Sequence, residues 1–179
     1  MKNALVIIDV QQGLFDEAPA PADADAVIER INALSVLARA SDVPVILVQH
    51  EVPGTRLQHD SLGWQLDSRL HVGPADHRIR KATPDSFLRT GLDEVLAFSG
   101  VEQVVICGYA TEFCVDTTTR SAAAHGYAVI LAADAHTTQD KAHASAAQIR
   151  VHHNATLPDI SSFGPVIDAV PAAQIRFAS

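Results

Sequence analysis

The sequence predicts an α/β fold with one doubly wound, mainly parallel sheet of about six strands and helices on both faces. Short apolar runs rich in β-branched residues, typical of buried strands, alternate along the chain with stretches whose apolar residues recur at helical spacing. Because the runs are continuously apolar, we expect them to be covered on both faces, as in a parallel sheet. The expected strands are 4–10, 44–48, 78–81, 104–107, 128–132 and 166–170.

Length and composition favour one globular domain over residues 1–179. The chain is 47% hydrophobic, and its length allows a sizeable core. Thirteen Lys and Arg against 21 Asp and Glu give a net charge of -8 without a basic run, which argues against a nucleic-acid partner or an anionic membrane surface. Two cysteines cannot form a disulfide framework, and no signal peptide or membrane-spanning stretch is evident. A cytoplasmic protein is expected.

Helices are expected at 23–40, from Pro84 to about Phe98, and at 141–153, where apolar residues recur at helical spacing. Residues 49–77 interrupt this alternation. They hold four histidines, two prolines, three glycines and the only tryptophan, without strong periodicity. A stretch of that length is more often a functional loop or lid than filler, so we expect it to contribute to a binding site.

The stretch from Val104 to Arg120 combines a buried strand with a helix that begins near a cysteine. Thr111 is a candidate N-cap and Gly126 a candidate C′ residue of this helix, so Cys114 is expected in its first turn. Unpaired N–H groups and the helix dipole favour a thiolate at such a position and can bind an oxyanion. Cys114 is therefore a candidate nucleophile, with a buried, small apolar side chain as the alternative.

Asp9 and Lys81 also lie at or just after the carboxyl ends of expected strands. Open parallel sheets bind ligands at this edge, so Asp9, Lys81 and Cys114 are candidates for a common site, although their spacing in the sequence does not show that they meet. Considered separately, Asp9 has the alternative role of a turn residue, and Lys81 that of a solvated surface charge.

Three motifs follow one another along the chain: residues 4–11 with Asp9, residues 80–87 with Lys81, and residues 106–118 with Cys114. Together they resemble the isochorismatase-like cysteine hydrolase superfamily, which includes nicotinamidases and N-carbamoylsarcosine amidohydrolases. The resemblance covers nearly the whole chain. It implies a three-layer, Rossmann-type fold, a small-molecule substrate, no cofactor, and a homodimer or larger homo-oligomer.

The resemblance also implies a catalytic triad. In it, Cys114 is the nucleophile, Asp9 the general base and acid, and Lys81 their cationic partner. The backbone of Ala110, Thr111 and Cys114 is implied to hold the oxyanion, and a cis peptide bond is implied between Ala110 and Thr111.

Gln11, Phe15, Trp64, Tyr109 and Phe113 are the candidates for substrate contact. Phe15 and Trp64 lie in loops from which the family places aromatic residues over the substrate, and Tyr109 and Phe113 flank the nucleophile. Packing is the alternative role for the aromatic residues. Gln11 can orient a substrate or support the loop.

No metal is predicted. Nicotinamidases of this family bind a metal through an Asp-x-His pair and a further histidine after the second strand. The corresponding residues 49–51 lack the aspartate, and His50, His59, Asp60 and His71 are scattered through the loop. Histidines in that pattern are more often solvated or hydrogen-bonding groups than ligands.

The expected activity is hydrolysis of an amide or ureido C–N bond in a small molecule, through a covalent thioester on Cys114. Two alternatives stay open. One is hydrolysis of the vinyl ether of an isochorismate-like acid with Asp9, as implied by relatives that lack the cysteine. The other is a non-enzymatic binding protein that retains the fold.

Overall fold

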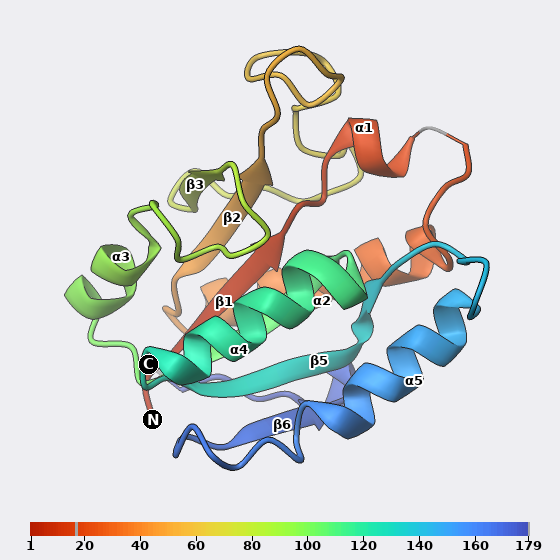
Figure 1. Ribbon diagram of the computed structural model, residues 1–179. Helices are drawn as coiled ribbons and strands as arrows, with labels where there is room; N and C mark the ends of the chain where they lie inside the picture. The colour runs from red at the N-terminus through yellow and green to blue at the C-terminus, as the bar shows by residue number, and fades with distance from the viewer. Residues whose placement is uncertain (17, 179) are drawn as a thin grey trace.

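The computed structural model describes residues 1–16 and 18–178 and contains one parallel sheet with helices on both faces (Figure 1). The strands are β1 (Asn3–Ile8), β2 (Val45–His50), β3 (His77–Lys81), β4 (Gln103–Tyr109), β5 (Ala128–Thr137) and β6 (Ile167–Val170). The helices are α1 (Gln12–Phe15), α2 (Ala24–Ala40), α3 (Leu92–Phe98), the π-helical turn η1 (Thr111–Val115), α4 (Asp116–Ala124), α5 (Ala146–Thr156) and the 3-10 helix η2 (Ala172–Gln174). The predicted fold class is confirmed.

The sheet has the strand order β3-β2-β1-β4-β5-β6. β1 lies between β2 and β4, and all of its residues are buried. From β1 the chain winds outwards to β3 and then returns to the centre to begin the other half at β4. Strand order therefore reverses between β1 and β4, the position at which open α/β sheets bind ligands.

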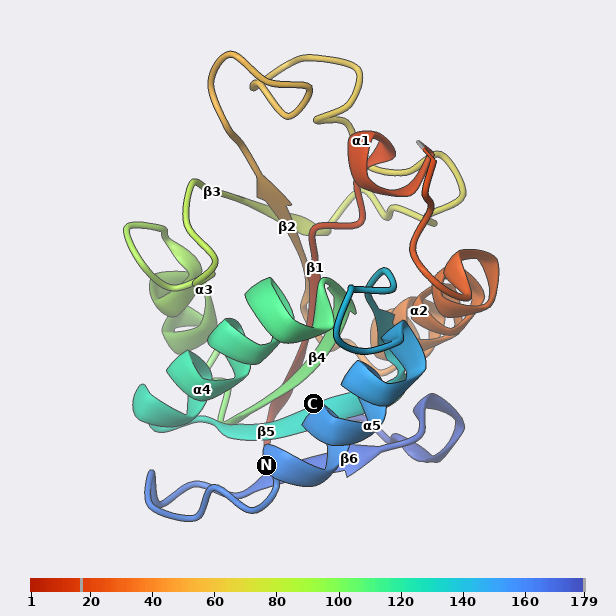
Figure 2. The same ribbon diagram turned by 45° about the vertical axis from the view of Figure 1, so that its right-hand side comes forward.

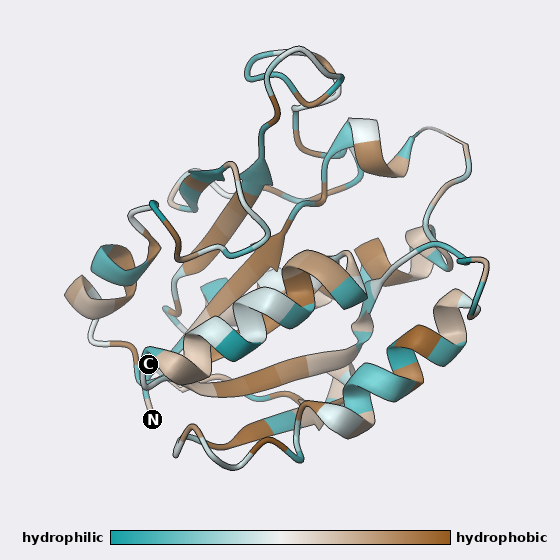
Figure 3. Ribbon diagram, in the orientation of Figure 1, coloured by the Kyte–Doolittle hydropathy of each residue, from teal (hydrophilic) through white to brown (hydrophobic). Residues whose placement is uncertain are grey.

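Alternate residues of β1 belong to two apolar clusters on opposite faces of the sheet. Val6 and Ile8 pack with side chains of α3 and α4, whereas Leu5 and Ile7 pack with α2 and with residues around η2. Figure 2 shows α4 and α5 on one side of the sheet and α2 on the other. The most hydrophobic residues concentrate on the strands between these layers (Figure 3). Burial of both faces explains the continuous apolar runs of the sequence.

Two helices begin later than predicted. α3 begins at Leu92 rather than at Pro84, because turns precede it, held by bonds such as that from the Thr90 hydroxyl to the backbone carbonyl four residues earlier. α5 begins after a capping box in which Ser145 and Gln148 bind each other's backbone N–H groups. Among the described residues, no helix is long and apolar enough to cross a membrane.

β5 is longer than predicted and continues past Ala132 to Thr137. Its pairing with β4 shifts register between Ile106 and Gly108, after which His136 lies opposite Gly108. The shift allows the strand to continue through polar residues that the sequence pattern assigns to a loop. His136 is thereby placed in the sheet, next to the strand that leads to Cys114.

The first part of segment 51–76 projects beyond the carboxyl ends of the strands and lies beside α1, and the rest returns along α2 to the start of β3 (Figures 1 and 2). Backbone bonds of 2.9 Å join the two, from Gln12 N–H to the Gln65 carbonyl and from Gly13 N–H to the Gly63 carbonyl. A Cβ on Gly63 would lie 2.4 Å from the Arg56 carbonyl oxygen, so only glycine fits this close approach. The segment is thus attached to the edge of the sheet where the candidate site residues lie.

Candidate active site

Asp9, Lys81 and Cys114 lie together at the carboxyl edge of the sheet. The Lys81 ammonium donates to Asp9 Oδ2 at 2.7 Å and to Cys114 Sγ at 3.2 Å. Asp9 and Lys81 are each 2% exposed, so this ion pair is shielded from water. The structure therefore brings together three side chains that the sequence places after three different strands. Their catalytic roles stay predictions.

The backbone around Asp9 aims its side chain at this point. Asp9 adopts the left-handed conformation, with φ of 53°, and its N–H donates to the Val48 carbonyl at 2.9 Å. Beside it, Gly108 of β4 packs so closely on β1 that a Cβ would lie 2.1 Å from the Ile8 carbonyl oxygen. The absent side chain at Gly108 thus lets the ends of β1 and β4 approach each other.

Cys114 lies in η1, which we call the nucleophile turn (Thr111–Val115). The N-cap is Ala110 rather than the predicted Thr111, because the Ala110 carbonyl already accepts bonds from the N–H groups of Phe113 and Val115. The predicted cis peptide bond between Ala110 and Thr111 is likewise wrong by one position, since the cis bond joins Tyr109 to Ala110.

The end of the following helix agrees with the sequence. His125 is the C-cap of α4, and Gly126 follows it with φ of 95°, which confirms the predicted stop. At the other end, Thr111 and Cys114 belong to the first helical turn, where backbone N–H groups lack carbonyl partners one turn earlier. Their predicted oxyanion contacts, and that of Ala110, stay predictions.

Opposing effects act on the pKa of the Cys114 thiol. Burial, together with the negative charge of Asp9, raises the pKa of the Cys114 thiol to about 12, although the Lys81 ammonium acts in the opposite direction. Burial and the Asp9 charge thus oppose the thiolate form that the start of a helix favours, so the thiol needs a proton acceptor. Asp9 Oδ1 is buried and has no hydrogen-bond partner among the described residues, so it is the nearby group that is available to take the thiol proton.

Alkylation of Cys114 tests this protonation state. With a pKa near 12, we expect the rate constant for iodoacetamide to rise about tenfold per pH unit from pH 7 to above pH 10, because only the thiolate reacts. Peptide mapping by mass spectrometry measures the adduct, and Cys107, which is fully buried, serves as the internal control. A plateau with a midpoint below pH 8 would restore the thiolate.

His50 is a member of the site that sequence reasoning left among loop histidines. It is the last residue of β2, and its Nδ1 lies 3.2 Å from Lys81 Nζ. Burial and the Lys81 charge lower the pKa of His50, so the ring is neutral and Nδ1 accepts from the ammonium. The Thr83 carbonyl also lies 3.1 Å from Lys81 Nζ, so the three hydrogens of the ammonium are shared among four acceptors. The position of His50 at the end of β2 is the sequence signal that could have identified it.

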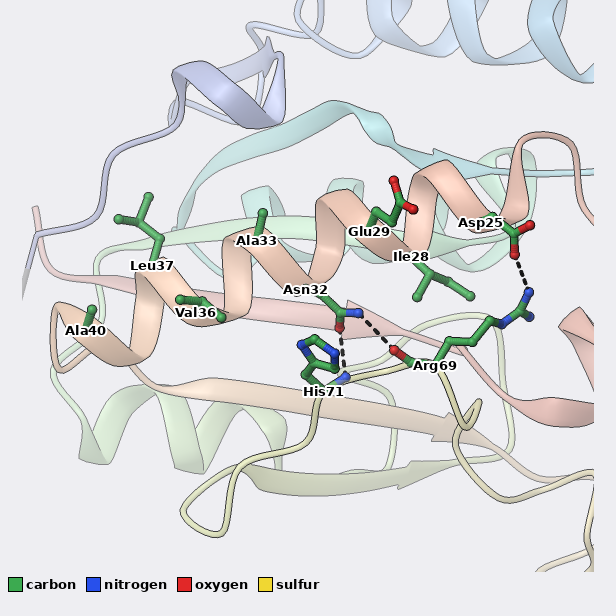
Figure 4. A pocket seen from close by; sticks show the side chains of 10 residues that line it. All are labelled: Asp25, Ile28, Glu29, Asn32, Ala33, Val36, Leu37, Ala40, Arg69 and His71. Atoms are coloured by element: carbon green, nitrogen blue, oxygen red, sulfur yellow. Dashed lines mark hydrogen bonds and ion pairs between the residues drawn. The ribbon is translucent and has the colours of Figure 1, made fainter.

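The scattered histidines do not form a metal site. His59 contacts Asp60 at 3.2 Å, whereas His71 lies beside α2, next to Asn32, on the wall of a groove of about 960 Å³ (Figure 4). Among the described residues, no group of three or more His, Cys, Asp or Glu side chains has the geometry to hold a metal ion. The residues present therefore do not fit the metal that nicotinamidases are expected to bind.

The aromatic candidates differ in exposure. Phe15 is 2% exposed and packs edge-on against Tyr109, with ring centroids 5.7 Å apart. Trp64 is 8% exposed and packs on His59, whereas Phe113 is 54% exposed. Phe113 is thus the aromatic side chain most open to a ligand, and substrate contact stays a prediction for all four candidates.

Gln11 has the contacts of a residue that supports the loop. Its side chain is buried, with Nε2 donating to the carbonyls of Trp64 (2.8 Å) and His50 (3.0 Å) and Oε1 accepting from the His50 N–H (2.8 Å). Both the oxygen and the nitrogen of the amide are thus occupied. These bonds correspond to support of the loop and leave the side chain little capacity to bind a substrate.

Comparison with known proteins gives a consistent result. Residues 3–169 match the family model described as the Isochorismatase domain. A streptothricin hydrolase of Streptomyces noursei is 34% identical over 142 residues, which cover 77% of this chain and 50% of the relative. The chain spans about half the length of this relative and of a second streptothricin hydrolase from the same organism.

Solved structures agree over nearly the full chain. A protein described as an isochorismatase family protein is 34% identical with a TM-score of 0.84, covering 94% of this chain and 97% of that one. N-carbamoylsarcosine amidase from Thermoplasma acidophilum has a TM-score of 0.82 at 20% identity, covering 98% of this chain and 99% of that one. At that identity the second likeness shows a shared fold.

Proposed function

The chain belongs to the isochorismatase family, and from that premise we propose that it is a cysteine-dependent hydrolase of small-molecule amide or ureido C–N bonds. The observation that supports this most is the position of the Lys81 ammonium, 2.7 Å from Asp9 and 3.2 Å from Cys114. A nucleophile and a carboxylate that both contact one cation are groups that covalent amide hydrolysis requires.

In the first half of the reaction, the Asp9 carboxylate accepts the thiol proton while Cys114 Sγ bonds to the substrate carbonyl carbon. Lys81 stabilises the negative charge that sulfur gains, and N–H groups of the nucleophile turn stabilise the oxyanion. The carbonyl then re-forms and the C–N bond breaks. Asp9 returns the proton to the leaving nitrogen, so an amine or ammonia departs and a thioester remains on Cys114.

In the second half, Asp9 takes a proton from water, whose oxygen attacks the thioester carbon. The C–S bond breaks, the proton passes to sulfur, and the acid is released. The cycle thus ends with the Cys114 thiol and the Asp9 carboxylate of the resting state. Because burial raises the pKa of the Cys114 thiol, the proposal assigns Asp9 the base function in the first step.

A turnover screen tests the proposal. The panel contains small carboxamides and ureido compounds, and also streptothricin, because one relative is named a streptothricin hydrolase. Released amine or ammonia is measured for the wild type, for Cys114→Ser and in the presence of excess EDTA. We expect turnover that EDTA leaves unchanged and that Cys114→Ser abolishes, with an acyl adduct on Cys114 in acid-quenched samples.

Other outcomes point to the alternatives. Hydrolysis of a vinyl-ether acid that survives Cys114→Ala would assign the reaction to Asp9 without covalent catalysis. Saturable ligand binding with no turnover and no adduct would favour a binding protein. Loss of turnover on addition of EDTA would contradict the metal-independent mechanism.

A further inference from the structure

A buried chain of hydrogen bonds joins the nucleophile turn to β5 and α5. Thr111 Oγ1 lies 2.9 Å from His136 Nδ1, and His136 Nε2 lies 2.9 Å from Asn154 Oδ1. Asn154 Nδ2 in turn donates to the Ala133 carbonyl at 2.8 Å. Thr111 and His136 are both fully buried, so the bond between them does not compete with solvent, whereas Asn154 is half-buried.

The donor and the acceptor of each hydrogen bond in this chain can be deduced by starting from the Ala133 carbonyl. The Ala133 carbonyl can only accept, so it fixes the orientation of the Asn154 amide and leaves Oδ1 facing His136. Oδ1 is also only an acceptor, so His136 Nε2 must carry a hydrogen. In a neutral ring Nδ1 is then an acceptor, and the Thr111 hydroxyl donates to it.

We propose that His136, as the neutral tautomer protonated on Nε2, is a positioning residue that holds the nucleophile turn through Thr111. This inference rests on the proposed function. Thr111 is the first residue of the turn, and it lies between Ala110 and Cys114, whose backbone is predicted to hold the oxyanion. A fixed Thr111 rotamer therefore restrains the segment that aims both the N–H groups and the thiol.

The surroundings of His136 maintain the neutral ring. Burial lowers its pKa to about 4. Arg150 and His153 on α5 also lower the pKa of His136, whereas the bond to Asn154 and the charge of Asp134 on β5 raise it. Because the folded ring stays unprotonated well below neutral pH, the Thr111 bond keeps one direction over the range in which an amide hydrolase is assayed.

The tautomer has a spectroscopic test that does not depend on activity. Nitrogen-15 NMR of labelled wild type is expected to show His136 with hydrogen on Nε2, a bare Nδ1, and no titration between pH 8 and about pH 5. Assignment uses the missing signal in a His136→Gln sample. A ring with hydrogen on Nδ1, or one that titrates near pH 6.5, would overturn the proposal.

Two matched substitutions separate the two bonds of the ring. In His136→Gln the amide reaches the Nε2 position and keeps the bond to Asn154 but loses Thr111, whereas in His136→Asn it reaches the Nδ1 position and keeps Thr111. We expect His136→Gln to lower kcat about tenfold to a hundredfold with KM nearly unchanged, since misplaced groups cost rate rather than binding. His136→Asn is expected to stay within about threefold of wild type, because the bond that restrains the turn is retained.

Thr111→Val and Thr111→Ser repeat the comparison from the other partner. Valine matches the shape of threonine without the hydroxyl and should reproduce the loss of kcat, while serine should rescue it. Equal kcat in wild type, His136→Gln and Thr111→Val would overturn the inference while leaving the proposed function intact. A wild type that turns over no substrate contradicts the proposed function instead.

Hydrogen exchange then decides the positioning role. Phe113 and Val115 donate their N–H groups to the Ala110 carbonyl, so faster exchange of these two amides in Thr111→Val but not in Thr111→Ser supports it. Unchanged exchange in both variants contradicts it.

Discussion

Replacing Cys114 with alanine is expected to lower kcat by about 10³-fold or more, because no other group can form the covalent intermediate. Serine is expected to fail similarly, since its hydroxyl is a poorer nucleophile and holds its proton more tightly. Steady-state turnover on the best substrate from the screen measures the loss. Stability should change little, because the Cys114 side chain is only partly buried and is small.

Cys107→Ala is the matched control for this experiment. Cys107 is fully buried and belongs to the apolar cluster under α2, whereas Cys114 packs against the cluster under α4. Loss of the Cys107 thiol should therefore lower the stability of the fold and leave kcat unchanged. If Cys114→Ala retains more than about a tenth of wild-type kcat, the covalent mechanism is wrong.

Lys81→Met is expected to destabilise the fold by about 3–5 kcal/mol, because it leaves the buried Asp9 carboxylate without its cation. Methionine has a similar length and fills the space of the lysine stem. Urea unfolding at pH 7, followed by circular dichroism, gives the free energy of unfolding. Turnover is also expected to be lost, since sulfur would lack its cationic partner at 3.2 Å.

The double variant Asp9→Asn/Lys81→Met separates these two effects. Asparagine suits the left-handed backbone of Asp9 and removes the charge. No unpaired charge then stays buried, so the double variant should be more stable than Lys81→Met alone and still inactive. A Lys81→Met protein within about 1 kcal/mol of wild type would mean that the ion pair is not shielded from water as the structure indicates.

Much of the fold could be predicted because each strand that is buried on both faces is marked by an apolar run in its own residues. Residues 4–8 are apolar because both faces of β1 are covered, and this is visible without a structure. The limits of β5 and α3 could not be predicted in the same way. β5 continues through Asp134 and His136 past an irregularity in its pairing with β4, and turns held by side-chain bonds of residues such as Thr90 precede α3.

The candidate site could likewise be predicted only in part from the sequence. Asp9, Lys81 and Cys114 could be selected because strand ends are recognisable in the sequence and meet at one edge. The rise in the pKa of Cys114 could not, since it arises from burial and from the charge of Asp9, which lies 105 positions away in the sequence. The proposed role of His136 could not be predicted either, because it depends on which ring nitrogen faces Thr111.

The close contact between Gly108 and β1 has a consequence for how this protein can diversify. Asp9 and Cys114, the predicted base and nucleophile, follow two strands whose approach at Gly108 is a contact of backbone against backbone, without an intervening side chain. Segment 51–76, by contrast, is joined to the sheet edge through α1 and the Gln11 amide, by bonds to its own backbone carbonyls. If it forms the wall of the site, as the sequence predicts, exchanging its exposed side chains would change the substrate while leaving the spacing of Asp9 and Cys114 unchanged.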